Sequence, residues 1–318
     1  MNYTLSTRTP SATRRHPLET RLTHRPEVLT RLYRLAETLG QWLGDDCSAD
    51  QAKSFRLSPR TETIISIKRM KTSLFITAAM LTAFAAVADL NTNIFTKAPT
   101  AEMLPGKGPA QSGDWFDQAW RERRTEFDRR AASEHGALIF LGDSITQGWG
   151  EVAQHFPKFK CANRGISGDT TRGVLFRLQE DVLDLEPAAI VLLIGTNDIG
   201  LGADPADVAD NMKAILASIR KTDANVPVVI CKVMPRADRS MTNAAPKIQE
   251  LNRRVDELVK ADPQCFRCDT WSIYGAAGTA TSGEFYDLLH LNPAGYTRWK
   301  TALDPILAKL NLPAAPAK

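Results

Sequence analysis

Five short apolar runs that alternate with longer amphipathic segments restrict the fold of this 318-residue chain more than any other feature. Strands that are buried on both faces are nearly continuous in apolar residues, and strand–helix alternation places them in a parallel sheet covered by helices. We therefore predict an α/β fold with three layers, α/β/α, around a five-stranded parallel sheet. The expected strands are Ala137–Leu141, Phe159–Ala162, Ala189–Ile194, Val226–Val233 and Cys265–Cys268.

The segments between these runs have the length and the apolar spacing of surface helices. The last of them begins with Asn292 as N-cap and Pro293 in the first helical position. The expected helices are 114–134, 171–183, 205–220, 245–260 and 293–310.

This regular pattern defines a domain at 113–312, followed by a tail at 313–318. Residues 89–112 are rich in Pro and Gly and are interpreted as a linker. Residues 1–69 form an N-terminal extension to which the sequence assigns no function.

The segment around Met70 has the three parts of a secretory signal peptide: basic residues, an uncharged stretch at 72–88, and the ending Ala-Val-Ala. We expect translation to begin at Met70, with residues 1–69 a misassigned start. A signal peptide at 70–88 predicts a secreted or periplasmic protein that begins near Asp89 and has no stable membrane insertion. The alternative is a membrane anchor at 72–88, a length near the lower limit for spanning a bilayer.

The charge distribution does not favour nucleic-acid binding. Residues 1–69 hold 12 Lys and Arg against 7 Asp and Glu, whereas residues 70–318 hold 28 against 29. The net charge of +4 therefore belongs to the N-terminal stretch, and the domain has no basic face for a nucleic-acid partner.

The cysteines are too few and too scattered to predict a disulfide framework. Cys265 and Cys268 fall in an expected strand, where residues three apart point to opposite faces and lie about 10 Å apart. That separation exceeds the ~7 Å limit for a disulfide, and two ligands do not complete a zinc site. We expect core cysteines and no metal. The five are Cys47, Cys161, Cys231, Cys265 and Cys268.

Polar segments follow the expected strands at the points where they end. A Gly-Asp-Ser turn at 142–144 follows the first strand, 163–171 the second and 195–198 the third, and Asp287 and His290 precede the last helix. Ligands of such sheets bind at the carboxyl ends of the strands, so these segments should converge on one edge. Each segment alone is an ordinary turn, whereas all four in this order form a specific pattern.

Ser144, Asp287 and His290 together have the chemistry of a serine hydrolase. A serine hydroxyl is a weak nucleophile until a base takes its proton, and His290 is suited to that role. The imidazolium that forms needs a fixed acceptor on its other nitrogen, which Asp287 can provide.

With these residues in view, the chain resembles the SGNH/GDSL hydrolase superfamily, whose four sequence blocks contribute Ser, Gly, Asn and His. Within it, the chain is similar to the catalytic subunits of intracellular platelet-activating-factor acetylhydrolase Ib and to related bacterial esterases. The resemblance covers about 137–310, and no block is missing. It is carried by Asn163-x-Gly165-x-x-Gly168-Asp169-Thr170-Thr171-Arg172, Val174-Leu175-x-Arg177-Leu178, Val191-Leu192-Leu193-Ile194-Gly195-Thr196-Asn197, Pro235-Arg236 and Asp287-x-Leu289-His290-Leu291.

The resemblance implies a flavodoxin-like fold and ester hydrolysis without metal or organic cofactor. It assigns Ser144 as nucleophile, His290 as base and Asp287 as the carboxylate that orients the base. The oxyanion hole would comprise the backbone N–H groups of Ser144 and Gly168 and the side-chain amide of Asn197. A glycine suits this position because an N–H without a neighbouring Cβ can approach the substrate closely.

Each of these residues also has a structural interpretation when it is taken alone. Ser144 and Asp287 are of types that cap helices and turns, Asn197 is common where strands end, and His290 would pack beneath the last helix. Gly168 would then serve only the backbone geometry.

The sequence also suggests roles for residues around the predicted site. Asp143 is expected to be structural, as the acceptor of a turn or a helix cap. Trp149 either lines the mouth of the site or packs against the sheet. Four more are expected to fix the loops: Arg164, Asp169, Thr171 and Arg172.

The predicted function is a serine ester hydrolase that removes short acyl groups, acetyl first, through an acyl-enzyme at Ser144. The substrate would be a small-molecule, glycan or lipid ester. The alternatives are a lysophospholipase- or thioesterase-type lipid hydrolase, and a non-catalytic glycan-binding domain with the same fold. The sequence leaves the oligomeric state open, with a homodimer among the alternatives.

Overall fold

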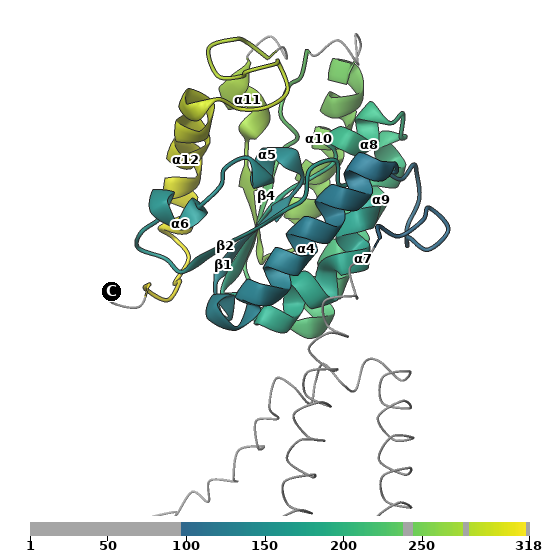
Figure 1. The fold of residues 1–318 in the computed structure, drawn as a ribbon. Helices are drawn as coiled ribbons and strands as arrows, with labels where there is room; N and C mark the ends of the chain where they lie inside the picture. The colour runs from purple at the N-terminus through teal and green to yellow at the C-terminus, as the bar shows by residue number, and fades with distance from the viewer. Residues whose placement is uncertain (1–96, 238–243, 276–279, 316–318) are drawn as a thin grey trace, which may run out of the picture. The chain divides into compact units, whose positions relative to one another are not determined.

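The computed structural model describes residues 97–237, 244–275 and 280–315 and contains five parallel strands in the order β2-β1-β3-β4-β5 (Figure 1). Leu138 of β1 lies between Cys161 of β2 and Ala189 of β3. A first strand between the second and the third is typical of flavodoxin-like folds, so the predicted fold class is confirmed. The strands are β1 (Leu138–Gly142), β2 (Cys161–Gly165), β3 (Ala189–Leu193), β4 (Val228–Cys231) and β5 (Cys265–Cys268).

Helices cover both faces of the sheet and complete the three layers (Figure 1). Side chains of α7, α9 and α10 pack in one core cluster, and side chains of α6, α11 and α12 pack in a second cluster on the other face. Helix α4 contacts α7 and β2. The helices are α4 (Asp114–Glu134), α5 (Ser144–Gln147), α6 (Val152–His155), α7 (Thr171–Asp181), α8 (Thr196–Gly200), α9 (Pro205–Thr222), α10 (Ala244–Ala261), α11 (Thr270–Tyr274) and α12 (Pro293–Leu307).

The position of β1 in the sheet explains why its sequence is apolar. Ile139 and Leu141 belong to the core cluster on one face, and Leu138 and Phe140 to the cluster on the other. All four are at most 1% exposed. Because successive side chains of a strand point to opposite faces, burial on both sides leaves no position for a polar residue.

Several elements differ in extent from the prediction, and three of them differ most. Strand β2 continues to Gly165, because its pairing with β1 includes two polar residues that the apolar pattern could not reveal. Strand β4 begins only at Val228, after Pro227, which has no N–H to donate to a neighbouring strand. Helix α12 ends at Leu307, and Pro305 has already removed one hydrogen bond from its last turns.

The described part of the predicted linker, 97–112, has no helix or strand but is fastened to the domain. Asn211 of α9 accepts from the backbone N–H of Lys107 at 3.0 Å and donates to its carbonyl at 2.8 Å. Pro and Gly prevent regular structure in this segment, but they do not prevent packing. Arg172 of α7 donates to four of its carbonyl oxygens, those of Ala101, Leu104, Pro105 and Gly108.

Cys265 and Cys268 lie in different core clusters on opposite sides of β5, as their spacing predicts. The described cysteines, Cys161, Cys231, Cys265 and Cys268, are free thiols.

Several predictions for the ends of the chain fall outside the described residues. They concern the extension at 1–69 with Cys47, the signal peptide at 70–88, and the end of the tail. Within the described ranges, no helix combines the length and the hydropathy that crossing a bilayer requires.

Candidate active site

Ser144 is the first residue of α5, directly beyond the carboxyl end of β1. Asp143 caps this helix, because its Oδ1 accepts the backbone N–H of Ile145 at 2.9 Å. The turn is so tight that a Cβ on Gly142 would lie 2.2 Å from the carbonyl oxygen of Leu193 and 2.3 Å from Oγ1 of Thr146. The Gly-Asp-Ser sequence therefore meets three local demands: close approach, a cap, and a hydroxyl at the edge of the sheet.

The structure brings Ser144, His290 and Asp287 into one hydrogen-bonded chain. Nε2 of His290 lies 2.9 Å from Oγ of Ser144, and Nδ1 of His290 lies 2.7 Å from Oδ2 of Asp287. The other carboxylate oxygen of Asp287 accepts the backbone N–H groups of Leu289 at 3.1 Å and His290 at 2.7 Å. Burial raises the pKa of Asp287, but the hydrogen bonds from His290 outweigh it and hold the pKa below its usual value. An ionised Asp287 can thus fix both the ring orientation and the tautomer of His290.

The predicted oxyanion-hole groups lie on neighbouring loops of the same edge. Gly168 has a φ of 82°, in the left-handed region that favours glycine. Among the described residues, neither its backbone N–H nor that of Ser144 has a hydrogen-bond acceptor. The side-chain amide of Asn197 donates to the carbonyl oxygen of Asp169 at 2.9 Å. Because an amide NH₂ has two hydrogens, this bond orients Asn197 and leaves a second donor.

A model of the GDSL-like Lipase/Acylhydrolase family matches residues 140–298. The chain belongs to this family. It is 30% identical over 206 residues to platelet-activating factor acetylhydrolase IB subunit alpha1 of Bos taurus, with 61% of this chain and 84% of the relative covered. It is 26% identical over 206 residues to the alpha2 subunit of Rattus norvegicus, with 61% and 86% covered.

The fold is also similar to that of a GDSL-like lipase from Bacteroides thetaiotaomicron. The TM-score is 0.52 and the identity 24%, with 57% of this chain and 97% of that chain covered. The family match confirms the predicted superfamily, and membership of the family makes the chain a hydrolase of ester bonds.

Three fully buried carboxyl groups lie beneath the site of this GDSL-family hydrolase. Burial raises the pKa of Asp143 to about 7 and those of Asp169 and Asp198 to about 6. Hydrogen bonds oppose the rise: Asp169 pairs with Arg177 at 2.8 Å, and Asp198 accepts the hydroxyl of Thr171 at 2.5 Å. Only one oxygen of Asp143 has a partner within the described structure. The cap role expected for Asp143 agrees with its geometry.

The structure decides between the two positions expected for Trp149 and places Trp115 beside Gly168. Trp149 is 4% exposed and stacks on Trp299 with ring centroids 4.6 Å apart, so it packs in the core and does not line the mouth of the site. Trp115 is 53% exposed, and its ring lies so close to Gly168 that an added Cβ there would be 2.5 Å from Trp115 Cη2. Because a helix turns about 100° per residue, the burial of Phe116 is compatible with an outward Trp115.

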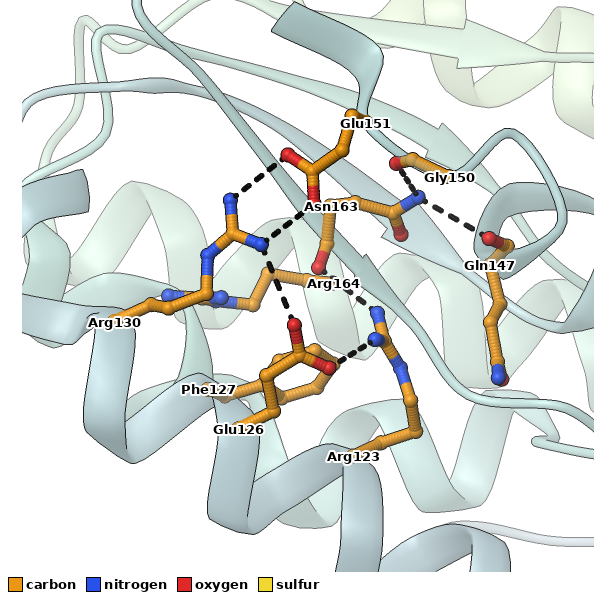
Figure 2. Close-up of a pocket in the computed structure, with 9 residues that line it drawn as sticks. All are labelled: Arg123, Glu126, Phe127, Arg130, Gln147, Gly150, Glu151, Asn163 and Arg164. Atoms are coloured by element: carbon orange, nitrogen blue, oxygen red, sulfur yellow. Dashed lines mark hydrogen bonds and ion pairs between the residues drawn. The ribbon is translucent and has the colours of Figure 1, made fainter.

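A cavity of about 60 Å³ lies between α4, β2 and the end of α5, and no member of the Ser144–His290–Asp287 chain lines it (Figure 2). Its charged side chains pair with one another: Arg130 bonds Glu126 and Glu151, and Arg123 bonds Glu126. Arg164, the fifth charged residue of the wall, pairs with Glu134 outside it, and the cavity is separate from the candidate active site.

Proposed function

We propose that this hydrolase is a serine esterase that removes short acyl groups through an acyl-enzyme at Ser144. The observation that carries the proposal is the continuous chain of contacts from Ser144 Oγ through the imidazole of His290 to Asp287, at 2.9 and 2.7 Å. A hydroxyl, a base and an orienting carboxylate in this order are the parts that nucleophilic acyl transfer requires.

In the acylation half of the proposed reaction, Ser144 Oγ attacks the ester carbonyl carbon while its proton moves to Nε2 of His290. The carbonyl oxygen becomes an oxyanion. When this intermediate collapses, the bond to the alcohol oxygen breaks, and that oxygen takes the proton from His290. The alcohol leaves, and the acyl group remains on Ser144.

Deacylation repeats these steps with water. His290 removes a proton from water, the resulting oxygen attacks the acyl carbon, and the proton returns to Ser144 Oγ as the carboxylic acid leaves. The imidazole is 39% exposed, so solvent can reach it.

Three donors would stabilise the oxyanion: the N–H groups of Ser144 and Gly168 and the free amide hydrogen of Asn197. Loss of one such donor typically costs about 3 kcal/mol, or roughly 10²–10³ in rate. Two of these donors belong to the backbone of tight turns, so they need no reorganisation when charge develops.

Acetyl is the acyl group we favour, because the curated relatives are named as acetylhydrolases. For the rest of the substrate, acetylated carbohydrate and acetylated lipid are the two classes that fit. Trp115 and Tyr286, 53% and 73% exposed, offer apolar faces to either class. A screen of acetylated sugars against acetylated glycerolipids, each with a propionyl and butyryl series, would separate them.

The deciding experiment compares p-nitrophenyl acetate hydrolysis by the wild type and by Ser144→Ala. The variant should lose nearly all activity while it retains the unfolding midpoint, and covalent labelling by an organophosphate should disappear with it. Equal rates in the two proteins would leave the glycan-binding alternative in its place.

We also propose export through the segment at 70–88, on the composition of that segment alone. N-terminal sequencing of the exported protein should give a start near Asp89. Retention of the residues before Met70 in an exported soluble form would contradict this.

A further inference from the structure

Arg177 of α7 is buried, with 0% of its side chain exposed. Its guanidinium reaches the backbone of two strand ends and two carboxylates, Asp169 and, at 3.5 Å from Nη1, Asp181. Nη2 donates to the carbonyl oxygens of Gly142 at 3.1 Å and Arg164 at 2.9 Å, and Nε donates to Oδ2 of Asp169 at 2.8 Å.

These partners belong to the segments that carry the candidate oxyanion donors. Gly142 closes β1 just before Ser144. Asp169 follows Gly168 directly, and its own carbonyl oxygen accepts the amide of Asn197 at 2.9 Å. One buried side chain is therefore joined to the segments of all three donors, directly to two of them and through Asp169 to the third.

We propose that Arg177 is a positioning residue that holds the three oxyanion donors in mutual register. This proposal rests on the proposed function, because it assigns Arg177 a task in stabilising the oxyanion. Arg177 acts through Gly142 and Asp169 and does not touch the substrate.

The geometry requires arginine in particular. A guanidinium is a planar fork with five N–H donors, so a single side chain can bond acceptors that lie in different directions. A lysine ammonium is a point charge on a flexible stem and cannot reproduce that fork. Arg177→Lys keeps the charge opposite Asp169 but should lose the bonds that fix the two carbonyls.

A purely structural ion pair is the competing explanation, and a matched control addresses it. Arg124 of α4 is also buried, at 4% exposure, and its guanidinium bonds both oxygens of Asp181 at 3.0–3.1 Å. It joins α4 to Glu180 and Asp181 of α7, and Asp181 also lies 3.5 Å from Nη1 of Arg177. Arg124→Lys therefore tests the loss of a buried arginine fork away from the site.

The experiment is a double-mutant cycle on the full chain with Arg177→Lys, Asn197→Ala and the double variant, assayed with p-nitrophenyl acetate. Each kcat is corrected by the folded fraction from thermal unfolding, and KM needs no such correction. We expect Arg177→Lys to lower kcat about tenfold or more with little change in KM, since oxyanion donors act on the transition state. Arg124→Lys should lower the unfolding midpoint comparably without this loss of kcat.

The decisive measure is coupling. If Arg177 acts through the placement of Asn197, the double variant should lose less than the product of the single losses. Multiplicative losses, or an unchanged kcat in Arg177→Lys, would overturn the proposal. Asp169→Asn keeps the carbonyl that Asn197 uses and removes only the ion pair, so it should reproduce the kcat loss. If neither variant folds, the pair belongs to the fold alone and the positioning role is refuted.

Ser144→Ala in the same assay distinguishes a failure of the proposed function from a failure of the role proposed for Arg177. Full activity in Ser144→Ala would refute the proposed function itself. An inactive Ser144→Ala beside a fully active Arg177→Lys would refute only the role of Arg177.

Discussion

Replacement of Asp287 by asparagine should disable the enzyme more than replacement by alanine. In the structure, Oδ1 of Asp287 accepts two backbone N–H groups, from Leu289 and His290, while Oδ2 faces Nδ1 of His290 at 2.7 Å. Asparagine has only one oxygen, and the two backbone donors compete for it with the imidazole. When the backbone wins, the NH₂ group faces Nδ1, the ring proton moves to Nε2, and His290 can no longer accept the proton of Ser144.

The size of the effect follows from these contacts. Turning the amide so that its oxygen faces His290 forfeits two hydrogen bonds of about 1 kcal/mol each, which leaves the productive orientation populated about 30-fold less. A neutral acceptor also stabilises the imidazolium less than a carboxylate, by about 1.4 kcal/mol or tenfold. We expect kcat for Asp287→Asn to fall about 300-fold. Asp287→Ala imposes no tautomer and should retain more activity.

The assay is p-nitrophenyl acetate hydrolysis at pH 8, with kcat and KM for both variants and thermal unfolding as control. Because the Asp287 side chain is 55% exposed, its replacement should hardly move the unfolding midpoint. A kcat for Asp287→Asn within tenfold of the wild type, or above that of Asp287→Ala, would refute the reasoning about the tautomer.

Three further predictions concern pH and the turns of the site. Protonation of His290 removes the base, so kcat/KM should fall as the solution is made more acidic; a rate constant flat to pH 4 would contradict this. Burial raises the pKa of Asp143 to about 7, so the folded state favours the protonated form, and the stability this contributes is full below pH 4 and lost as pH rises through 7. Urea unfolding of Asp143→Asn should therefore find the variant more stable than the wild type at pH 8 and the difference gone at pH 4; an equal gain at both values would exclude the titration. Gly168→Ala should lower kcat at least tenfold, because φ is 82° and the new Cβ would meet Trp115 at 2.5 Å; normal kinetics would remove Gly168 from the oxyanion hole.

The sheet could be predicted because its strands are marked by one local property. Runs such as Ala189–Leu193 are buried on both faces, so their sequence is apolar throughout. Strand β2 was harder, because it places Asn163 and Arg164 among paired residues. Their side chains bond distant groups: Asn163 the carbonyls of Thr146 and Gly150, and Arg164 the carbonyl of Asp181 at 2.9 Å. No local pattern contains those partners.

The candidate site also contains residues that the sequence could predict and one that it could not. Ser144, Asp287 and His290 could be proposed from residue type and chain order, because parallel strands deliver their ends to one edge. The sequence showed Arg177 only as one residue of a motif and gave it no role, because an arginine on an amphipathic helix ordinarily indicates a solvated face. Its burial depends on three acceptors from three segments, which only the folded chain brings together.

The oxyanion donors and the loop that carries His290 are held in place by different means. The Arg177–Asp169 pair beneath the oxyanion donors is wholly buried, so its bonds do not compete with water. His290 is 39% exposed, yet its loop is closed by bonds of its own, from the N–H of Tyr286 to the carbonyl of His290 at 2.8 Å and from the N–H of Asn292 to the carbonyl of Glu284 at 2.9 Å. In the proposed mechanism this exposure lets the alcohol leave and water enter, while the closed loop keeps the imidazole in place. Asp287 is 55% exposed whereas Arg177 is buried, and therefore Asp287→Asn should cost activity alone, whereas Arg177→Lys should cost activity and stability together.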